Sequence, residues 1–187
     1  DEVATVLAIS REDLERLGAV TPEIGQQLSS FCRGRMIANL LRHSSILGSV
    51  SGKDREALFH RFATEHFDPG HALVEEGGEG TGLFLLASGA VEVVGRDSDG
   101  DELRIAELGP GNVVGEISLV LRRPANATVR ALTPTVALHL GRDDFQDAIR
   151  EHPTLLGELY ETATQRDEET RTVVAQEAMD VEDIVLL

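Results

Sequence analysis

Apolar and polar positions divide the chain into a helical beginning, a β-rich middle and a helical end. Between residues 67 and 140, short apolar runs alternate with turn signals such as Pro69-Gly70, Ser88-Gly89 and Pro110-Gly111. Many short strands separated by turns are typical of sandwiches and barrels. The pattern predicts strands at 71–75, 83–87, 90–95, 102–108, 127–131 and 135–140.

Helical periodicity marks both ends of the chain. Residues 11–17 carry leucines on one helical face and follow an apolar run, 3–9, that predicts a strand. Thr21 and Pro22 suit the N-cap and first position of a helix, and Ser51 suits the cap of the next. The predicted helices are 11–17, 21–42, one from Ser51 to near His66, 143–150, and one from Pro153 to about Gln176, with a tail of unassigned structure.

The two helical ends resemble each other. A gapless shift of 131 residues pairs Leu7 with Leu138, Arg11 with Arg142, Asp13 with Asp144, Pro22 with Pro153 and Leu28 with Leu159. Both copies share the order strand, helix, proline, helix, which predicts a tandem repeat. Residues 1–50 are then the last strand and helices of a preceding domain, 51–150 are the β-rich domain, and 151–187 are a C-terminal helix and tail. An ordinary N-terminal helical bundle is the alternative.

Charge narrows the classes of partner. The chain has 17 Lys and Arg against 33 Asp and Glu, a formal net charge of -16. Such a chain is repelled by phosphate backbones and anionic bilayers, so neither nucleic acid nor membrane is predicted as a partner. The single cysteine, Cys32, allows no disulfide within the chain and favours a cytoplasmic location. No apolar stretch approaches the roughly 18 residues that a membrane span requires.

The segment LVEEGGEGTGLFLLASG, residues 73–89, combines turn glycines with a buried strand. It resembles the first signature of the cyclic nucleotide-binding family, and Gly77, Gly80, residues 83–86 and Gly89 fit that signature. Glycines suit such turns because they adopt positive φ without steric cost. The resemblance implies a mainly β fold, a double-stranded β-helix or jelly roll called the β-roll, with helices at both ends.

A second segment, residues 114–129, carries the more specific resemblance. We call VGEISLVLRRPANATV the cassette segment, because it resembles the phosphate-binding cassette of the same family. By that resemblance Gly115 allows close approach of the backbone, Glu116 binds the ribose, and the amides of Ile117 and Ser118 face the cyclic phosphate. Unpaired amides and the dipole of a helix N-terminus attract anions.

The cassette segment lacks the arginine with which the family clamps the phosphate. With Pro124 and Thr128 in register, Ala125 occupies that position, and Asn126 and Ala127 complete the predicted ligand-binding set. Losing a charge-assisted hydrogen bond to a buried anion costs on the order of 2 to 4 kcal/mol, roughly 30- to 1000-fold in affinity. Arg123 is the candidate to replace the missing cation, although a solvated surface position is its other interpretation.

Other residues give little indication of catalysis. The six histidines show no HxH or HExxH spacing, and no serine or cysteine lies in a nucleophile motif. We therefore predict a protein that is not an enzyme, has no cofactor, and senses cAMP, cGMP or a similar small anion weakly as a regulatory module. The alternative is a degenerate roll that binds no nucleotide and mediates dimerisation or docking; a metal-dependent cupin enzyme is a distant third. Expected partners are other domains of the same polypeptide and a second copy, through helices 21–42 and 153–176.

Overall fold

The computed structural model describes residues 10–25, 27, 34, 40, 50, 52–97 and 100–185, in two units, Asp1–Asn39 and Leu40–Leu187. In the first unit, α1 (Arg11–Val20) confirms the helix predicted at 11–17. Its N-cap is Ser10, whose hydroxyl accepts a hydrogen bond from the Asp13 amide at 3.1 Å. The strand predicted at 3–9, most of the helix at 21–42 and the Ser51 cap lie outside the described residues.

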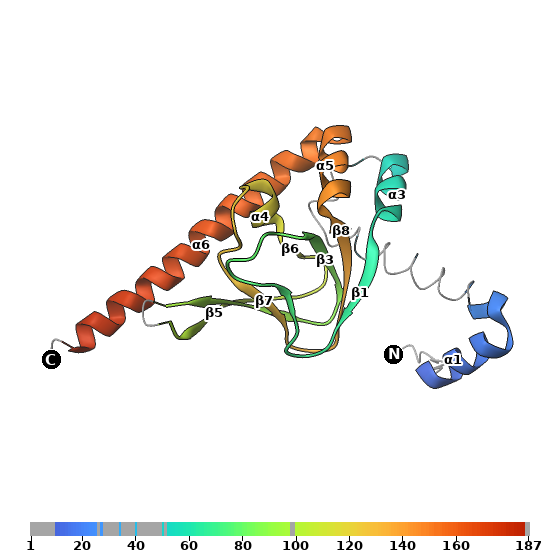
Figure 1. Ribbon diagram of the computed structural model, residues 1–187, viewed down its shortest axis with the longest axis horizontal. Helices are drawn as coiled ribbons and strands as arrows, with labels where there is room; N and C mark the ends of the chain where they lie inside the picture. The colour runs from blue at the N-terminus through green and yellow to red at the C-terminus, as the bar shows by residue number, and fades with distance from the viewer. Residues whose placement is uncertain are drawn as a thin grey trace, which may run out of the picture. The chain divides into compact units, whose positions relative to one another are not determined.

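The second unit holds a β-roll with helices at its ends (Figure 1). Its elements are α3 (Gly52–His60), β1 (Ala63–Phe67), β2 (Ala72–Val74), β3 (Gly82–Ser88), β4 (Val91–Arg96), β5 (Glu102–Leu108), β6 (Val113–Val114), α4 (Glu116–Val120), β7 (Thr128–Ala131), β8 (Thr135–Gly141), α5 (Arg142–Glu151) and α6 (Pro153–Val185). The predicted mainly β fold with flanking helices is confirmed.

Two four-stranded antiparallel sheets enclose the core, in the orders β1-β8-β3-β6 and β2-β7-β4-β5. Side chains of both sheets meet between them in one apolar cluster: Leu73, Phe84, Leu86, Val91, Val114, Val129, Ala131 and Ala137. Gly89 makes the turn from β3 to β4 with φ +87°, and a Cβ there would lie 2.5 Å from Thr135 Oγ1. The glycine is thus required by the crossing of β8 as well as by the turn.

Three elements differ from the sequence-based expectation. The helix expected to end near His66 ends at His60, and Ala63–Phe67 is the edge strand β1, held by pairing with β8. The strand β6 has two residues, too few for a periodic pattern. The last helix, expected to end near Gln176, continues to Val185.

α5 and α6 follow the last strand and pack against the roll. Phe145 and Ala148 form the buried side of α5, which packs on β3 and β8. The proline at position 153 opens α6, a position that has no need of an amide donor. Leu155, Leu159 and Ala163 then form its buried stripe, and α6 packs on α4, α5, β4 and β5. None of the described helices is both long and apolar enough to cross a bilayer.

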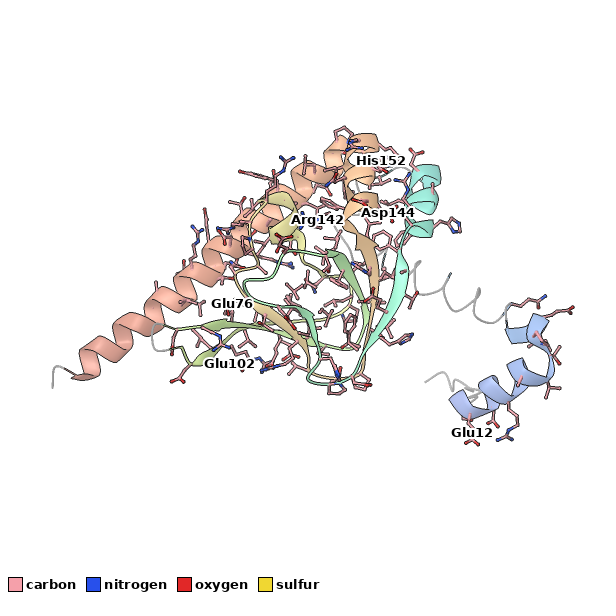
Figure 2. All side chains as sticks on the ribbon, in the orientation of Figure 1. Glu12, Glu76, Glu102, Arg142, Asp144 and His152 are labelled. Atoms are coloured by element: carbon pink, nitrogen blue, oxygen red, sulfur yellow. The ribbon has the colours of Figure 1, made fainter. Side chains whose placement is uncertain are left out.

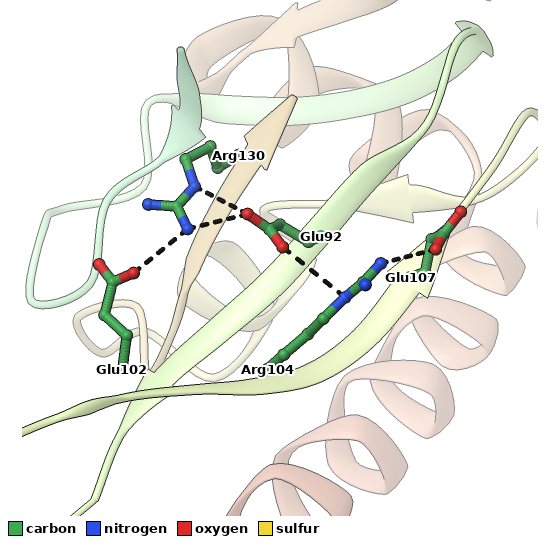
Figure 3. A network of polar contacts seen from close by, with 5 residues as sticks. All are labelled: Glu92, Glu102, Arg104, Glu107 and Arg130. Carbon is green, nitrogen blue, oxygen red and sulfur yellow. Dashed lines mark hydrogen bonds and ion pairs between the residues drawn. The ribbon is translucent and has the colours of Figure 1, made fainter. Parts of the chain in front are cut away.

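Five charged side chains form a network on the sheet of β4, β5 and β7 (Figure 3). Glu92 and Glu107 are cross-strand neighbours, and Arg104 forms ion pairs with both, at 3.6 Å to Glu92 and 2.6 Å to Glu107. Arg130 donates from Nε to Glu92 at 2.9 Å and from Nη2 to Glu102 at 3.2 Å. Like charges that face each other across strands are destabilising, so the arginines make this pairing of acidic strands tolerable.

Candidate ligand-binding site

The start of α4 is set by a glycine in a left-handed conformation. Gly115 has φ +85°, and a Cβ there would lie 2.5 Å from the carbonyl oxygen of Gly82. Any other residue would meet both a strained backbone and the neighbouring strand. Gly115 therefore lets α4 begin directly against β3, with Glu116 as its first residue.

A second close contact seats α4 on the turn before β3. A Cβ at Gly80 would lie 2.6 Å from the Cβ of Ser118, so position 80 has room for glycine alone. Ser118 is 3% exposed, and its Oγ atom is buried without a hydrogen-bond partner. A buried hydroxyl that makes no hydrogen bond is costly, and it is available to a ligand.

The loop after α4 is tied to the turn between β2 and β3 by backbone hydrogen bonds. The Gly77 amide donates to the Ala125 carbonyl at 2.8 Å, and the Ala125 amide donates to the Gly78 carbonyl at 3.0 Å. Ala125 is 8% exposed. The position where the sequence lacks an arginine is therefore fixed by the backbone, and only a methyl group projects from it.

Between the cassette segment, the sheet of β2, β4, β5 and β7, and α6 lies a cavity of about 110 Å³, which we call the roll cavity. Its ionisable lining residues are Glu116, Arg166 and Glu169. Most of the others are apolar, among them Val74, Val93, Ile105, Leu108, Val114, Ala125, Ala127 and Val129. Pockets that hold small molecules measure roughly 300 to 1,000 Å³. The roll cavity is therefore too small for a ligand the size of a nucleotide unless one of its walls moves.

An arginine of α6 binds the carboxylate of the cassette segment. Arg166 Nη1 donates to Glu116 Oε1 at 2.9 Å and to the Val113 carbonyl at 2.5 Å, while Nη2 donates to Asn112 Oδ1 at 3.3 Å. Glu116 is 2% exposed. Burial raises the pKa of Glu116 above its ordinary value, and the attraction and hydrogen bond of Arg166 offset part of that rise.

The next residue of α6, Asp167, is bound by the loop of the cassette segment. Asp167 is 6% exposed, and Asn126 Nδ2 donates to its Oδ1 at 2.8 Å. Arg123 makes an ion-pair contact with the same carboxylate, as does Arg171 at 3.4 Å. Burial lowers the pKa of Arg123, and the charge of Arg171 lowers it further. Thus α6 places a cation on Glu116 and an anion beside Asn126.

Comparison with known proteins assigns the β-roll and its cassette segment to a protein family. Residues 64–152 match the family model described as the cyclic nucleotide-binding domain. These residues belong to the cyclic nucleotide-binding domain family. The domain includes β1 to β8, α4 and α5, and therefore the whole cassette segment.

The relatives of the cyclic nucleotide-binding domain include regulatory subunits of protein kinases. A cAMP-dependent protein kinase regulatory subunit from Debaryomyces hansenii is 30% identical over 116 residues, which are 62% of this chain and 25% of that protein. The solved regulatory subunit of a cAMP-independent protein kinase A from Trypanosoma brucei is 27% identical, with a TM-score of 0.61 over 74% of this chain and 53% of that one. The corresponding structure from Trypanosoma cruzi, bound to guanosine, is 26% identical, with a TM-score of 0.59 over 71% of this chain and 50% of that one.

This chain therefore spans about a quarter of the curated relative and about half of these solved structures.

The domain brings most of the predicted ligand-binding residues together. Gly115, Glu116, Ile117, Ser118, Ala125, Asn126 and Ala127 all line the roll cavity. Arg123 is not among the lining residues; its guanidinium instead contacts Asp167 of α6, where the opposite charge attracts it. Arg123 is thus placed neither as a free surface residue nor at the cavity, and in this state it does not replace the missing arginine.

Two residues at the site were missed in the sequence, Arg166 and Asp167. They lie on α6: Arg166 is 50 positions after Glu116, and Asp167 is 41 positions after Asn126. A signal was present: the stripe of Leu155, Leu159 and Ala163 recurs every four residues, and its next member is Asp167. A charged residue on the buried stripe of a helix indicates a partner of opposite charge or a polar contact beneath it.

Proposed function

We propose that the chain is a regulatory module, without catalysis of its own, in which a small ligand in the roll cavity competes with α6. The observation that supports this most directly is Glu116. A carboxylate that is 2% exposed, with its pKa raised by burial, is costly for folding. Buried ionisable groups with shifted pKa values are concentrated at functional sites, where the group is needed for binding or catalysis. A ligand hydroxyl that donates to Glu116 would take the place of the Arg166 guanidinium.

The charge of the roll cavity determines which ligands it holds well. Its ionisable lining residues are two acids and one arginine, and Arg166 is already paired with Glu116. The methyl group of Ala125 offers nothing to a phosphate. We therefore propose that cyclic AMP, cyclic GMP or another small anion binds weakly. A sugar hydroxyl and an apolar ring system suit the lining better than a charged phosphate does, and the similar protein from Trypanosoma cruzi was solved with a nucleoside, guanosine.

A degenerate roll that binds no nucleotide is the second candidate. It is favoured by Arg166 and Asp167, which occupy the polar side of the site with groups of the chain itself. In that case the roll keeps its shape and acts through dimerisation or docking. For the cupin alternative the described residues give no support, since they contain no group of three or more His, Cys, Asp or Glu that could hold a metal ion.

The test is isothermal titration of the chain with cyclic AMP, cyclic GMP, adenosine and guanosine, at protein concentrations that detect millimolar dissociation constants. We expect saturable binding that Glu116→Ala abolishes and that Glu168→Ala, at an exposed position of α6 outside the cavity lining, preserves. Ala125→Arg should tighten the binding of the cyclic nucleotides by about 30-fold or more and leave the nucleosides unchanged.

The outcomes separate the two candidates. If the native chain binds none of the four compounds but Ala125→Arg gains cyclic nucleotide binding, the roll has lost its ligand, and the second candidate holds. If neither chain binds any of them while circular dichroism shows both folded, the proposed ligand class is wrong.

A further inference from the structure

A groove of about 1080 Å³ lies outside the roll, between the cassette segment on one side and α5 with the first turns of α6 on the other. We call it the arginine groove. Ser118 lines both this groove and the roll cavity, so α4 forms a wall between the two. Apart from Ser118, the groove and the roll cavity share no lining residue.

The groove has an apolar floor with two exposed large side chains. Phe145 of α5 is buried at its base. On α6, Leu156 is 37% exposed and Tyr160 is 54% exposed. They lie four positions apart and therefore project from one face of the helix. Exposed apolar groups in a hollow, rimmed by polar residues, are typical of an interaction site.

The rim of the groove is basic although the chain is strongly acidic. Its charged lining residues are four arginines, Arg122, Arg123, Arg142 and Arg150, and one acid, Glu79. The whole chain has 17 basic and 33 acidic residues, so acids outnumber bases about two to one. In the groove lining the bases outnumber the acid, which distinguishes this surface from the rest of the chain.

Local contacts neutralise these arginines in part, and Arg123 is already paired with the buried Asp167. Arg142, at the start of α5 (Figure 2), donates twice to the Gly80 carbonyl, which carries no formal charge. Arg150 forms an exposed ion pair with Asp147 at 2.8 Å. Arg122 is exposed and has φ +54°, a left-handed conformation that costs a non-glycine residue about 1 kcal/mol or more. The loop thus keeps an exposed arginine in the groove lining in spite of local strain.

We infer that the arginine groove docks an acidic amphipathic helix of a protein partner. The apolar face of such a helix covers Leu156 and Tyr160, and its carboxylates meet the arginines on both sides. Binding of an amphipathic helix in an apolar groove is a recurring mode of recognition. Charge complementarity selects the acidic form. A nucleic acid also carries negative charge, but the net charge of -16 repels a long phosphate backbone and a helix presents a much smaller charged surface.

The probe is a fluorescein-labelled helical peptide in which leucines recur at helical spacing and glutamates fill the other positions. Its controls are a scrambled peptide of the same composition and a peptide with lysine in place of glutamate. Fluorescence anisotropy measures the affinity for the whole chain, and sedimentation measures its oligomeric state with and without peptide.

Three variants test the groove, with one matched control. We expect Arg150→Glu to weaken peptide binding by about tenfold and Tyr160→Ala by a similar factor. Arg122→Glu should act as Arg150→Glu does. The control is Arg16→Glu on α1, because Arg16 is similarly exposed and similarly paired with acids of its own helix, Glu12 and Asp13. It should bind the peptide as the native chain does. Thermal melts confirm that each variant is folded.

Several results would overturn the inference. Equal binding of the scrambled or lysine peptide would mean that no helix is recognised, as would equal weakening by Arg16→Glu and Arg150→Glu. If Arg150→Glu and Tyr160→Ala instead abolish self-association of the chain in the absence of peptide, the occupant is a second copy and not an acidic partner.

Discussion

Glu116 is a charged group that the protein shields almost completely from water. Its carboxylate pairs with Arg166, and burial nevertheless raises its pKa above the ordinary value of 4.5. The desolvation of the carboxylate thus outweighs the attraction of Arg166. Ser118 also carries a cost of burial, a smaller one, because its hydroxyl is buried without a hydrogen-bond partner. Both costs fall on residues of the cassette segment, and both would be relieved by a ligand that donates and accepts hydrogen bonds.

The raised pKa gives a sign for the pH dependence of stability. The folded state binds the proton of Glu116 more tightly than the unfolded state does, so this residue favours folding at acidic pH. That contribution is lost as pH rises above 4.5 and through the raised pKa. We expect Glu116→Gln to gain stability relative to the native chain as pH increases, and to differ least near pH 4. Urea unfolding of both chains between pH 4 and pH 8 measures this difference; a value that does not change with pH would contradict desolvation of the carboxylate as its cause.

At the scale of the element, α6 joins parts of the roll that are distant in sequence. Through Arg166 it holds α4 and the carbonyl of Val113 at the start of β6. Through Asp167 it holds the loop of the cassette segment, and through Val174 it packs near Gly95 of β4. Helices that bind a site through polar side chains, instead of apolar ones, can exchange those contacts for a ligand or for water.

Removal of Arg166 should reveal how much of the packing of α6 on the roll depends on its ion pair with Glu116. Arg166→Ala leaves Glu116 buried without its cation, so we expect a loss of about 2 to 4 kcal/mol at neutral pH. The loss should shrink at acidic pH, because protonated Glu116 needs no cation. Unfolding in urea at two pH values measures the loss, and amide hydrogen exchange shows whether α6 opens. Gln165→Ala, one position away and exposed, is the control and should change neither.

The sequence predicts elements whose pattern is local and misses those set by distant contacts. The buried run of β3 and the alternation in β4, β5 and β8 were recognised because one face of each meets the core. β1 was missed because residues such as Thr64 and His66 are exposed and its pairing with β8 alone makes it a strand. The cavity residues of the cassette segment were predicted by resemblance. The stripe on α6 marks Asp167 as buried, but the partners of Arg166 and Asp167 depend on where α6 crosses the roll, which no local pattern encodes.

At the scale of the whole molecule, α6 forms part of the wall of the roll cavity. The cavity of about 110 Å³ is too small for a nucleotide, so the binding that we propose requires displacement of α6. By linkage, any contact that holds α6 in place lowers the affinity for such a ligand, and binding of the ligand weakens that contact by the same free energy. α6 also contributes Leu156 and Tyr160 to the arginine groove, so an occupant of the groove acts on the same helix.

This coupling can be measured as a distance. Spin labels at Glu107→Cys on β5 and Glu168→Cys on α6, with Cys32→Ser as background, report the separation of α6 from the roll. We expect a saturating ligand to shift this distance by about 5 Å. A control pair at Glu107→Cys and Thr64→Cys lies within the roll and should not move. Saturable heat in titration together with an unchanged distance in both pairs would contradict the coupling.

The length of α6 has one more consequence. At 33 residues, it extends about 50 Å along its axis. Its described packing on the strands reaches Val174, and the helix continues to Val185, roughly 16 Å further. The C-terminal part of α6 therefore extends beyond its described packing on the strands. In the mechanism that we propose, a tilt of about 20° near Leu159 would carry Glu168 by roughly 5 Å and the far end of the helix by roughly 14 Å, so that a small change at the cavity becomes a larger displacement at Val185.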